Sequence, residues 1–271
     1  MQIQMVTFSA AKDGNAPGEW QDGACGGVAP DGRWARFVVL DGATTAYDPV
    51  RWVDQLVRSF APPAGGSAGS RLPRLEPAAM RTWFAEMQDR WAAEVRDFDS
   101  IIEERKFAEV GSFATLLGFE IYALDGPEPY WRAVSLGDTV LFHVRAGRLL
   151  AAFPPMGPDD FGTLPDGVHT SRASLDKMTE RLRTGGGVLE AGDFLFAATD
   201  AMAQWILRAV GRDEAKVWAT LTTLAHPDVF ARLVGDQRRE QDGVKRMKND
   251  DVTLMRLRML AGQPAFLLAC R

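Results

Sequence analysis

Aspartates at the ends of apolar segments are the side chains of this sequence best suited to chemistry. Asp41 and Asp200 each end an apolar run, and Asp250 comes shortly before another. Asp22 precedes Gly23 and a strand-like region, and Asp138 lies in a glycine-containing turn. A buried carboxylate is costly to desolvate, and several together repel unless cations neutralise them. Magnesium and manganese prefer oxygen ligands. The pattern therefore predicts a magnesium or manganese site, although any one of these aspartates alone is also a common turn residue.

The elements that would position these aspartates follow from apolar periodicity. Phe37–Leu40 is typical of a buried strand ending in an Asp-Gly turn, and Pro49–Phe60 of a helix with Asp48 as its N-cap. Apolar side chains recur at helical spacing after Pro77 and predict one long helix over Pro77–Lys106.

The middle of the chain changes to short apolar or alternating segments separated by turns, which predicts an antiparallel meander. Its four segments are Phe113–Ala123, Trp131–Leu136, Val140–Val144 and Arg148–Phe153. After it we expect a loop-rich region Pro154–Gly187 with a short helix Ser174–Arg183, a strand Phe194–Thr199, helices Ala201–Val210, Arg212–Leu224 and Pro227–Gln241, and strands Val252–Met259 and Pro264–Ala269. This order favours an α+β fold with two antiparallel sheets covered by helices.

Composition excludes several function classes. The 271 residues are 46% hydrophobic and 25% charged with a net charge of −5, which does not suit a nucleic-acid groove. No apolar run is long enough to span a membrane, and the first residues have no basic signal-peptide region. We expect a cytoplasmic protein with one domain over residues 1–271, a flexible Pro/Gly/Ser-rich loop at about 61–71, and reduced Cys25 and Cys270.

Six short motifs, taken in order, resemble those of the PPM (type 2C) metal-dependent Ser/Thr protein phosphatase family in its bacterial form. They are Gln21-Asp22, Leu40-Asp41-Gly42, Gly111-Ser112-Phe113-Ala114-Thr115, Leu136-Gly137-Asp138-Thr139, Ala198-Thr199-Asp200-Ala201 and Asn249-Asp250-Asp251-Val252-Thr253. The resemblance covers almost the whole chain. It implies a four-layer α-β-β-α sandwich of two antiparallel sheets flanked by helices.

The resemblance also implies a role for each site residue. Asp41 would bridge two manganese or magnesium ions, with the Gly42 carbonyl at the second ion and Asp200 and Asp250 at the first. Asp138 would hold a third, weaker ion. Asp22 and Gln21 would lie beside the second ion. A metal-activated water would then hydrolyse phospho-Ser/Thr in a protein substrate. The partner would be a cognate Ser/Thr kinase that phosphorylates the same substrate.

Four departures from the family pattern leave alternatives open. Gln21 stands where the family often has Glu, Ala43 follows Asp41-Gly42 where eukaryotic members have His, and Ala201 stands where the family has Gly. Lys12 is the cation nearest the place of a phosphate-gripping arginine. One alternative is a pseudophosphatase that acts as a binding or regulatory module, and another is an unrelated α+β domain with aspartates in turns.

The loop-rich segment Met156–Gly187 is where we expect substrate specificity, because variable loops on a rigid scaffold often carry it. Its Gly185–Gly187 run predicts a flexible hairpin or lid.

Overall fold

The computed structural model describes most of the chain. The described residues are 1–16, 19–29, 32, 34–61, 73–94, 96–122, 124–126, 128–162, 165–239, 243–263 and 265–270. The loop expected at about 61–71 lies outside the described residues apart from its first residue.

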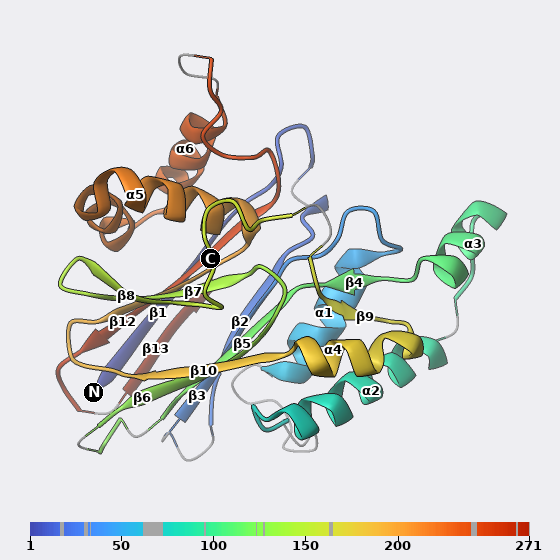
Figure 1. The fold of residues 1–271 in the computed structure, drawn as a ribbon, viewed down its shortest axis with the longest axis horizontal. Coiled ribbons are helices and arrows are strands. Elements are labelled where there is room, and N and C mark those ends of the chain that lie inside the picture. The colour runs from blue at the N-terminus through green and yellow to red at the C-terminus, as the bar shows by residue number, and fades with distance from the viewer. Residues whose placement is uncertain are drawn as a thin grey trace.

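Two β-sheets form the middle of the molecule (Figure 1). The six-stranded sheet has the order β13-β1-β12-β11-β7-β8, with β13 Ala265–Cys270, β1 Gln2–Ala10, β12 Val252–Leu260, β11 Phe194–Ala198, β7 Val140–Arg145 and β8 Arg148–Phe153. The five-stranded sheet has the order β10-β6-β5-β3-β2, with β10 Arg183–Val188, β6 Tyr130–Leu136, β5 Leu116–Tyr122, β3 Trp34–Leu40 and β2 Gly23–Val28. A short pair joins β4 Phe113–Ala114 to β9 Val168–His169.

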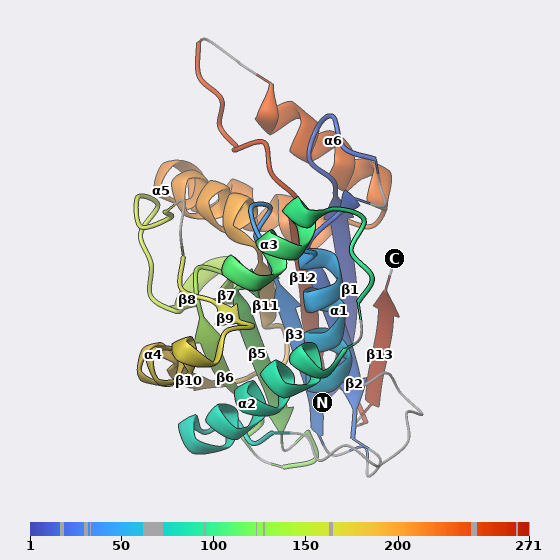
Figure 2. The ribbon, with the colours of Figure 1, turned by 90° about the vertical axis from the view of Figure 1, so that its right-hand side faces the viewer.

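Helices cover the outer face of each sheet. In Figure 1 the strands separate α5 and α6 from α1, α2 and α4, and in Figure 2 α1 and α2 lie in front of the strands. The helices are α1 Pro49–Phe60, α2 Pro77–Ala93, α3 Ile101–Glu109, α4 Leu175–Arg181, α5 Asp200–Thr223 and α6 Pro227–Arg238.

Three apolar clusters hold these layers together. Alternate residues of each strand point to opposite faces, so each sheet contributes to two clusters. Met5, Phe37 and Leu257 belong to the cluster that draws on both sheets, whereas Trp218 of α5 packs on the six-stranded sheet and Trp52 of α1 on the five-stranded one. The predicted four-layer α-β-β-α sandwich is confirmed.

The first helix over the five-stranded sheet begins as the sequence predicts. Asp48 is the N-cap of α1, its carboxylate accepts the N–H of Arg51 at 3.3 Å, and Pro49 is the first helical residue. Because α1 follows β3 after a short turn, its N-terminal end lies close to the residues that end β3.

The predicted long helix Pro77–Lys106 is wrong, because the chain forms two helices there. The α2 helix ends at Ala93, and α3 begins after Ser100, whose hydroxyl accepts the N–H of Glu103 at 3.2 Å. A new N-cap therefore starts a second helix where periodicity alone suggested continuation.

The predicted meander is also wrong as one unit. β5 and β6 pair in the five-stranded sheet, but β7 and β8 pair in the six-stranded sheet. The Gly137-Asp138-Thr139 turn thus carries the chain from one sheet to the other. This crossing places Asp138 where the two sheets meet.

Three smaller expectations differ from the structure. Gly185–Gly187 lie within β10, an edge strand paired with β6, and not in a flexible hairpin or lid. The helices expected on either side of Gly211 are merged into α5 with a kink at Asp213. The six-stranded sheet is not wholly antiparallel as expected, because β13 pairs in parallel with β1.

Candidate active site

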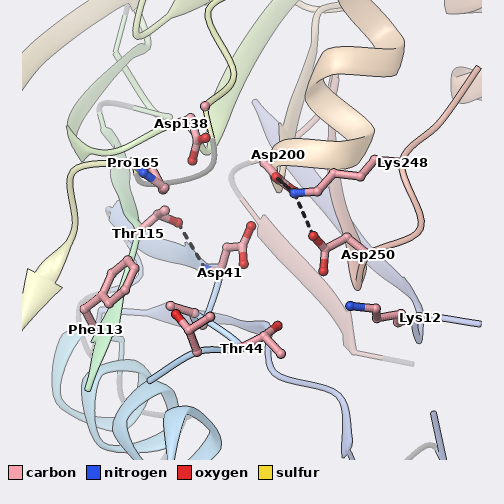
Figure 3. A pocket seen from close by; sticks show the side chains of 14 residues that line it. Lys12, Asp41, Thr44, Phe113, Thr115, Asp138, Pro165, Asp200, Lys248 and Asp250 are labelled. Carbon is pink, nitrogen blue, oxygen red and sulfur yellow. Dashed lines mark hydrogen bonds and ion pairs between the residues drawn. The ribbon is translucent and has the colours of Figure 1, made fainter. Parts of the chain in front are cut away.

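Four of the predicted aspartates line one cavity of about 340 Å³. Asp41, Asp138, Asp200 and Asp250 approach it from different segments of the chain (Figure 3). The other lining residues are Lys12, Gly42, Ala43, Thr44, Thr45, Phe113, Thr115, Gly162, Pro165 and Lys248. Residues more than 200 positions apart in the sequence thus share one site.

Asp41 is fixed through its backbone at the end of β3. Its N–H donates to the Thr115 hydroxyl at 3.2 Å, and its carbonyl accepts the Thr115 N–H at 2.9 Å. The Thr115 hydroxyl is also 2.6 Å from the hydroxyl of Thr139, next to Asp138. These contacts leave the Asp41 carboxylate free to point into the cavity (Figure 3).

Gly42 is required by a close approach of two backbone segments. A Cβ added at Gly42 would lie 2.5 Å from the carbonyl oxygen of Gln21. The predicted partners Gln21 and Gly42 therefore do come together, but through the Gln21 backbone. The Gln21 side chain is not among the described residues that line the cavity.

Asp138 is buried without a partner. It is 3% exposed, and neither carboxylate oxygen has a hydrogen-bond partner in the described part of the protein. Burial, and then the charge of Asp200, raises the pKa of Asp138 to about 7. Both carboxylate oxygens of Asp138 therefore remain available to coordinate a cation.

Asp22 is buried and is not among the residues that line the cavity. It is 4% exposed, and its Oδ2 accepts hydrogen bonds from Thr199 at 3.0 Å and Thr253 at 2.8 Å. The Thr199 hydroxyl also accepts the Thr253 N–H at 2.9 Å. Asp22 thereby ties together the residue before Asp200 and the strand after Asp250. Its Oδ1 remains unpartnered among the described atoms.

Asp200 and Asp250 share a lysine. The Lys248 ammonium is 2.9 Å from Asp200 Oδ2 and 2.7 Å from Asp250 Oδ2 (Figure 3). Asp200 is the first residue of α5, where the helix dipole also favours a carboxylate. Sequence reasoning did not identify Lys248, and the only signal was its position two residues before Asp250.

Asp251 has a different role from its neighbour Asp250. Its Oδ1 accepts the N–H of Lys12 and its Oδ2 the N–H of Gln21, both at 2.8 Å. Asp251 is therefore a structural clamp on the N-terminal segment. It holds Lys12 at the cavity, into which the Lys12 side chain extends from the side of Asp250 (Figure 3).

The electrostatics of the cluster call for positive charge. Burial raises the pKa of Asp41, and the charges of Asp22, Asp200, Asp138 and Asp250 raise it further. Burial likewise raises the pKa of Asp22 well above its ordinary value, against the hydrogen bonds from its two threonines. Both shifts mean that the ionised cluster is unfavourable unless cations compensate it.

The donors fit a hard divalent cation in their chemistry, because all are oxygens and Asp138 has two of them buried and unused. In this structure the carboxylates of Asp200 and Asp250 are spaced around the ammonium of Lys248 and not around a metal ion. Among the described residues, no three Asp, Glu, His or Cys side chains are grouped closely enough to hold one metal ion as they stand.

No family model and no curated protein matches the sequence. Several solved structures match the fold. PppA of Pseudomonas aeruginosa, a regulatory component of T6SS, is 17% identical with a TM-score of 0.56 over 95% of this chain and 98% of its own. The S. agalactiae serine/threonine phosphatase is 13% identical with a TM-score of 0.58 over 95% and 99%. The structure containing the PP2C phosphatase domain of SpoIIE from Bacillus subtilis is 16% identical with a TM-score of 0.53 over 97% and 64%.

These likenesses define the class of fold. The chain has the α+β sandwich fold of type 2C protein phosphatases, as the sequence motifs predicted. No helix in the described ranges combines the length and the apolar character needed to cross a membrane.

Proposed function

We propose that this protein is a metal-dependent phosphoprotein phosphatase of the PPM (type 2C) family that removes phosphate from serine and threonine side chains. The observation that carries the proposal is the meeting of Asp41, Asp138, Asp200 and Asp250 in one cavity. The cofactors would be two manganese or magnesium ions, with a third, weaker ion at Asp138. Residues 1–271 would act as one domain in the cytoplasm.

Different residues of the site would bind the metal ions, attract the phosphate and position the metal ligands. Asp41, the Gly42 carbonyl, Asp200 and Asp250 would hold the ions, which would supply an activated water and stabilise charge on the phosphoryl group. Lys12 would attract a phosphoryl oxygen as a point charge, without the paired hydrogen bonds of an arginine. Asp22 would keep the strands around Asp200 and Asp250 in register through its two threonines.

The lining of the cavity supports direct attack by water. No Cys, Ser or His is among the described residues around it, and the four aspartates there are the groups that we assign to the metal ions and not to covalent attack on phosphorus. The substrate would be a phosphorylated protein supplied by a Ser/Thr kinase. Gly162 and Pro165 line the cavity and belong to the segment Met156–Gly187, where we expect substrate specificity.

A second candidate function is a pseudophosphatase that binds other proteins without turnover. Two observations favour it. The Gln21 side chain does not line the cavity, and Lys248 already forms ion pairs with Asp200 and Asp250. In that case the fold would serve as a regulatory module.

Phosphate release from phosphothreonine and phosphotyrosine peptides tests the proposal. We expect manganese-dependent release from the phosphothreonine peptide alone, and its loss in Asp41→Asn. Asp54→Asn serves as a control, because Asp54 is exposed on α1 and pairs only with Arg58 in the described structure. No release by folded protein with manganese, from either peptide, would favour the pseudophosphatase.

A further inference from the structure

Lys248 occupies a distinctive place in the acidic cluster. Its ammonium contacts Asp200 Oδ2 at 2.9 Å and Asp250 Oδ2 at 2.7 Å. The lysine side chain is 48% exposed, while those of Asp200 and Asp250 are 11% and 26% exposed. The half-exposed Lys248 side chain thus pairs with two carboxylates that are more deeply buried than itself.

A divalent cation shared by these carboxylates would need the same space. Magnesium lies about 2.1 Å from its oxygen ligands and accepts no nitrogen cation beside them. The position between Asp200 Oδ2 and Asp250 Oδ2 can therefore hold the ammonium or the metal, but not both. The two states exclude each other by charge as well as by volume.

Displacement of the lysine is physically simple. Lys248 lies on the segment between α6 and β12, and its long side chain already borders solvent. Its ammonium can move into water while the backbone of Asp250 stays fixed, because Arg238 donates to the Asp250 carbonyl and Asp22 anchors Thr253.

We propose that Lys248 is a built-in counter-ion that stabilises the metal-free protein and competes with the metal for Asp200 and Asp250. The metal-free protein is held together at this site by its own lysine, and metal binds only as that lysine leaves. Lys248 consequently sets the metal concentration at which the site fills. This inference rests on the proposed metal-dependent function.

Manganese titration by calorimetry on chelator-stripped protein tests the competition. Lys248→Met and Lys248→Gln both remove the charge, and Lys245→Met is the matched control, since Lys245 is exposed in the same segment and forms no ion pair with the described residues. We expect both Lys248 variants to bind manganese about tenfold more tightly than wild type, because two ion pairs no longer oppose binding. Lys245→Met should bind like wild type.

Thermal unfolding supplies a second readout that does not involve activity. In chelator the Lys248 variants should have a lower Tm than wild type, because Asp200 and Asp250 lose the ammonium that pairs with both, and manganese should raise their Tm by more than it raises that of wild type. Lys248→Gln repeats the test if Lys248→Met does not fold.

The outcomes separate this inference from the proposed function. Equal or weaker manganese binding by the Lys248 variants, together with manganese-dependent hydrolysis by wild type, would overturn the inference and leave the function standing. Failure of wild type and Lys248 variants alike to bind manganese would overturn both. Manganese binding by the Lys248 variants but not by wild type would support the inference, and would show that Lys248 prevents metal binding in the natural protein.

Discussion

The hydroxyl of Thr253 donates a hydrogen bond of 2.8 Å to the buried carboxylate of Asp22, joining residues 231 positions apart. Thr199 makes a second such bond, and the Thr253 N–H donates to the Thr199 hydroxyl. Asp200 comes directly after Thr199, and Asp250 lies three residues before Thr253. The relative position of these two pocket carboxylates therefore depends on a network centred on a third.

Thr253→Val should destabilise the protein by about 1–3 kcal/mol, because it removes one of two hydrogen bonds to a buried carboxylate while keeping the shape of the side chain. Urea unfolding in chelator measures the change. Thr223→Val is the control, since Thr223 is exposed at the end of α5, and we expect it to stay within about 0.5 kcal/mol of wild type. Equal stability of Thr253→Val and wild type would show that Asp22 does not depend on this bond.

Asp250→Asn and Asp251→Asn should have opposite consequences. Asp250 lines the cavity, so its variant should lose manganese affinity. Its stability in chelator should change little, because the lost ion pair with Lys248 is offset by the removal of one of the clustered negative charges. Asp251 binds the backbone of Lys12 and Gln21, so its variant should lose about 1–3 kcal/mol of stability and keep most of its manganese affinity. Calorimetry and urea unfolding of both variants check this. The reverse pattern would transfer the metal-binding role to Asp251.

The stability of the metal-free protein should depend on the protonation of Asp138. Its pKa is about 7 in the folded protein, above the ordinary value of 3.8, first because it is buried and then because Asp200 is near. The folded state thus binds this proton more tightly than the unfolded chain. The contribution of Asp138 to the free energy of unfolding is intact below pH 4, falls as the pH rises to about 7, and stays low above that.

Asp138→Asn removes this dependence. At pH 8 in chelator the variant should exceed wild type in stability by up to about 4 kcal/mol, and near pH 4 the two should be alike. Unfolding curves in urea at both pH values measure the difference. A variant that is less stable than wild type at pH 8 would contradict the account of a buried, unpartnered carboxylate.

Gly42→Ala should destabilise the protein by about 1–3 kcal/mol and weaken metal binding, because the added Cβ would lie 2.5 Å from the Gln21 carbonyl oxygen. Gly211→Ala in α5 is the matched control. A Cβ at Gly211 meets no atom within 4 Å, so alanine there should raise helix stability by about 0.5–1 kcal/mol. Thermal unfolding of the two variants should therefore shift in opposite directions, and parallel shifts would refute the steric argument.

The sequence was informative where a residue's role depends on its neighbours in the chain. The strand before Asp41, the cap at Asp48 and the order of the motifs are local features, and they predicted the sandwich fold and the aspartates that line the cavity. The sheet exchange at Asp138 could not be predicted, because turns within one sheet and between two sheets use the same residue types.

The features that the sequence did not predict depend mainly on contacts between distant segments of the chain. Asp251 could not be told from Asp250 by sequence, since only the fold brings Lys12 and Gln21 to one of them. Lys248 lay in a charged stretch that is commonly a solvated surface. The helix break before Ser100 was missed because apolar spacing does not register a competing N-cap.

Hydrolysis of p-nitrophenyl phosphate by purified protein, with and without millimolar manganese, is the most direct test of the central claim that the four converging aspartates form a metal-dependent hydrolytic site. We predict turnover that requires manganese in wild type, is lost in Asp41→Asn and Asp200→Asn, and is retained in the exposed control Asp54→Asn. Turnover that persists in chelator, or that survives in both Asp41→Asn and Asp200→Asn, would contradict it.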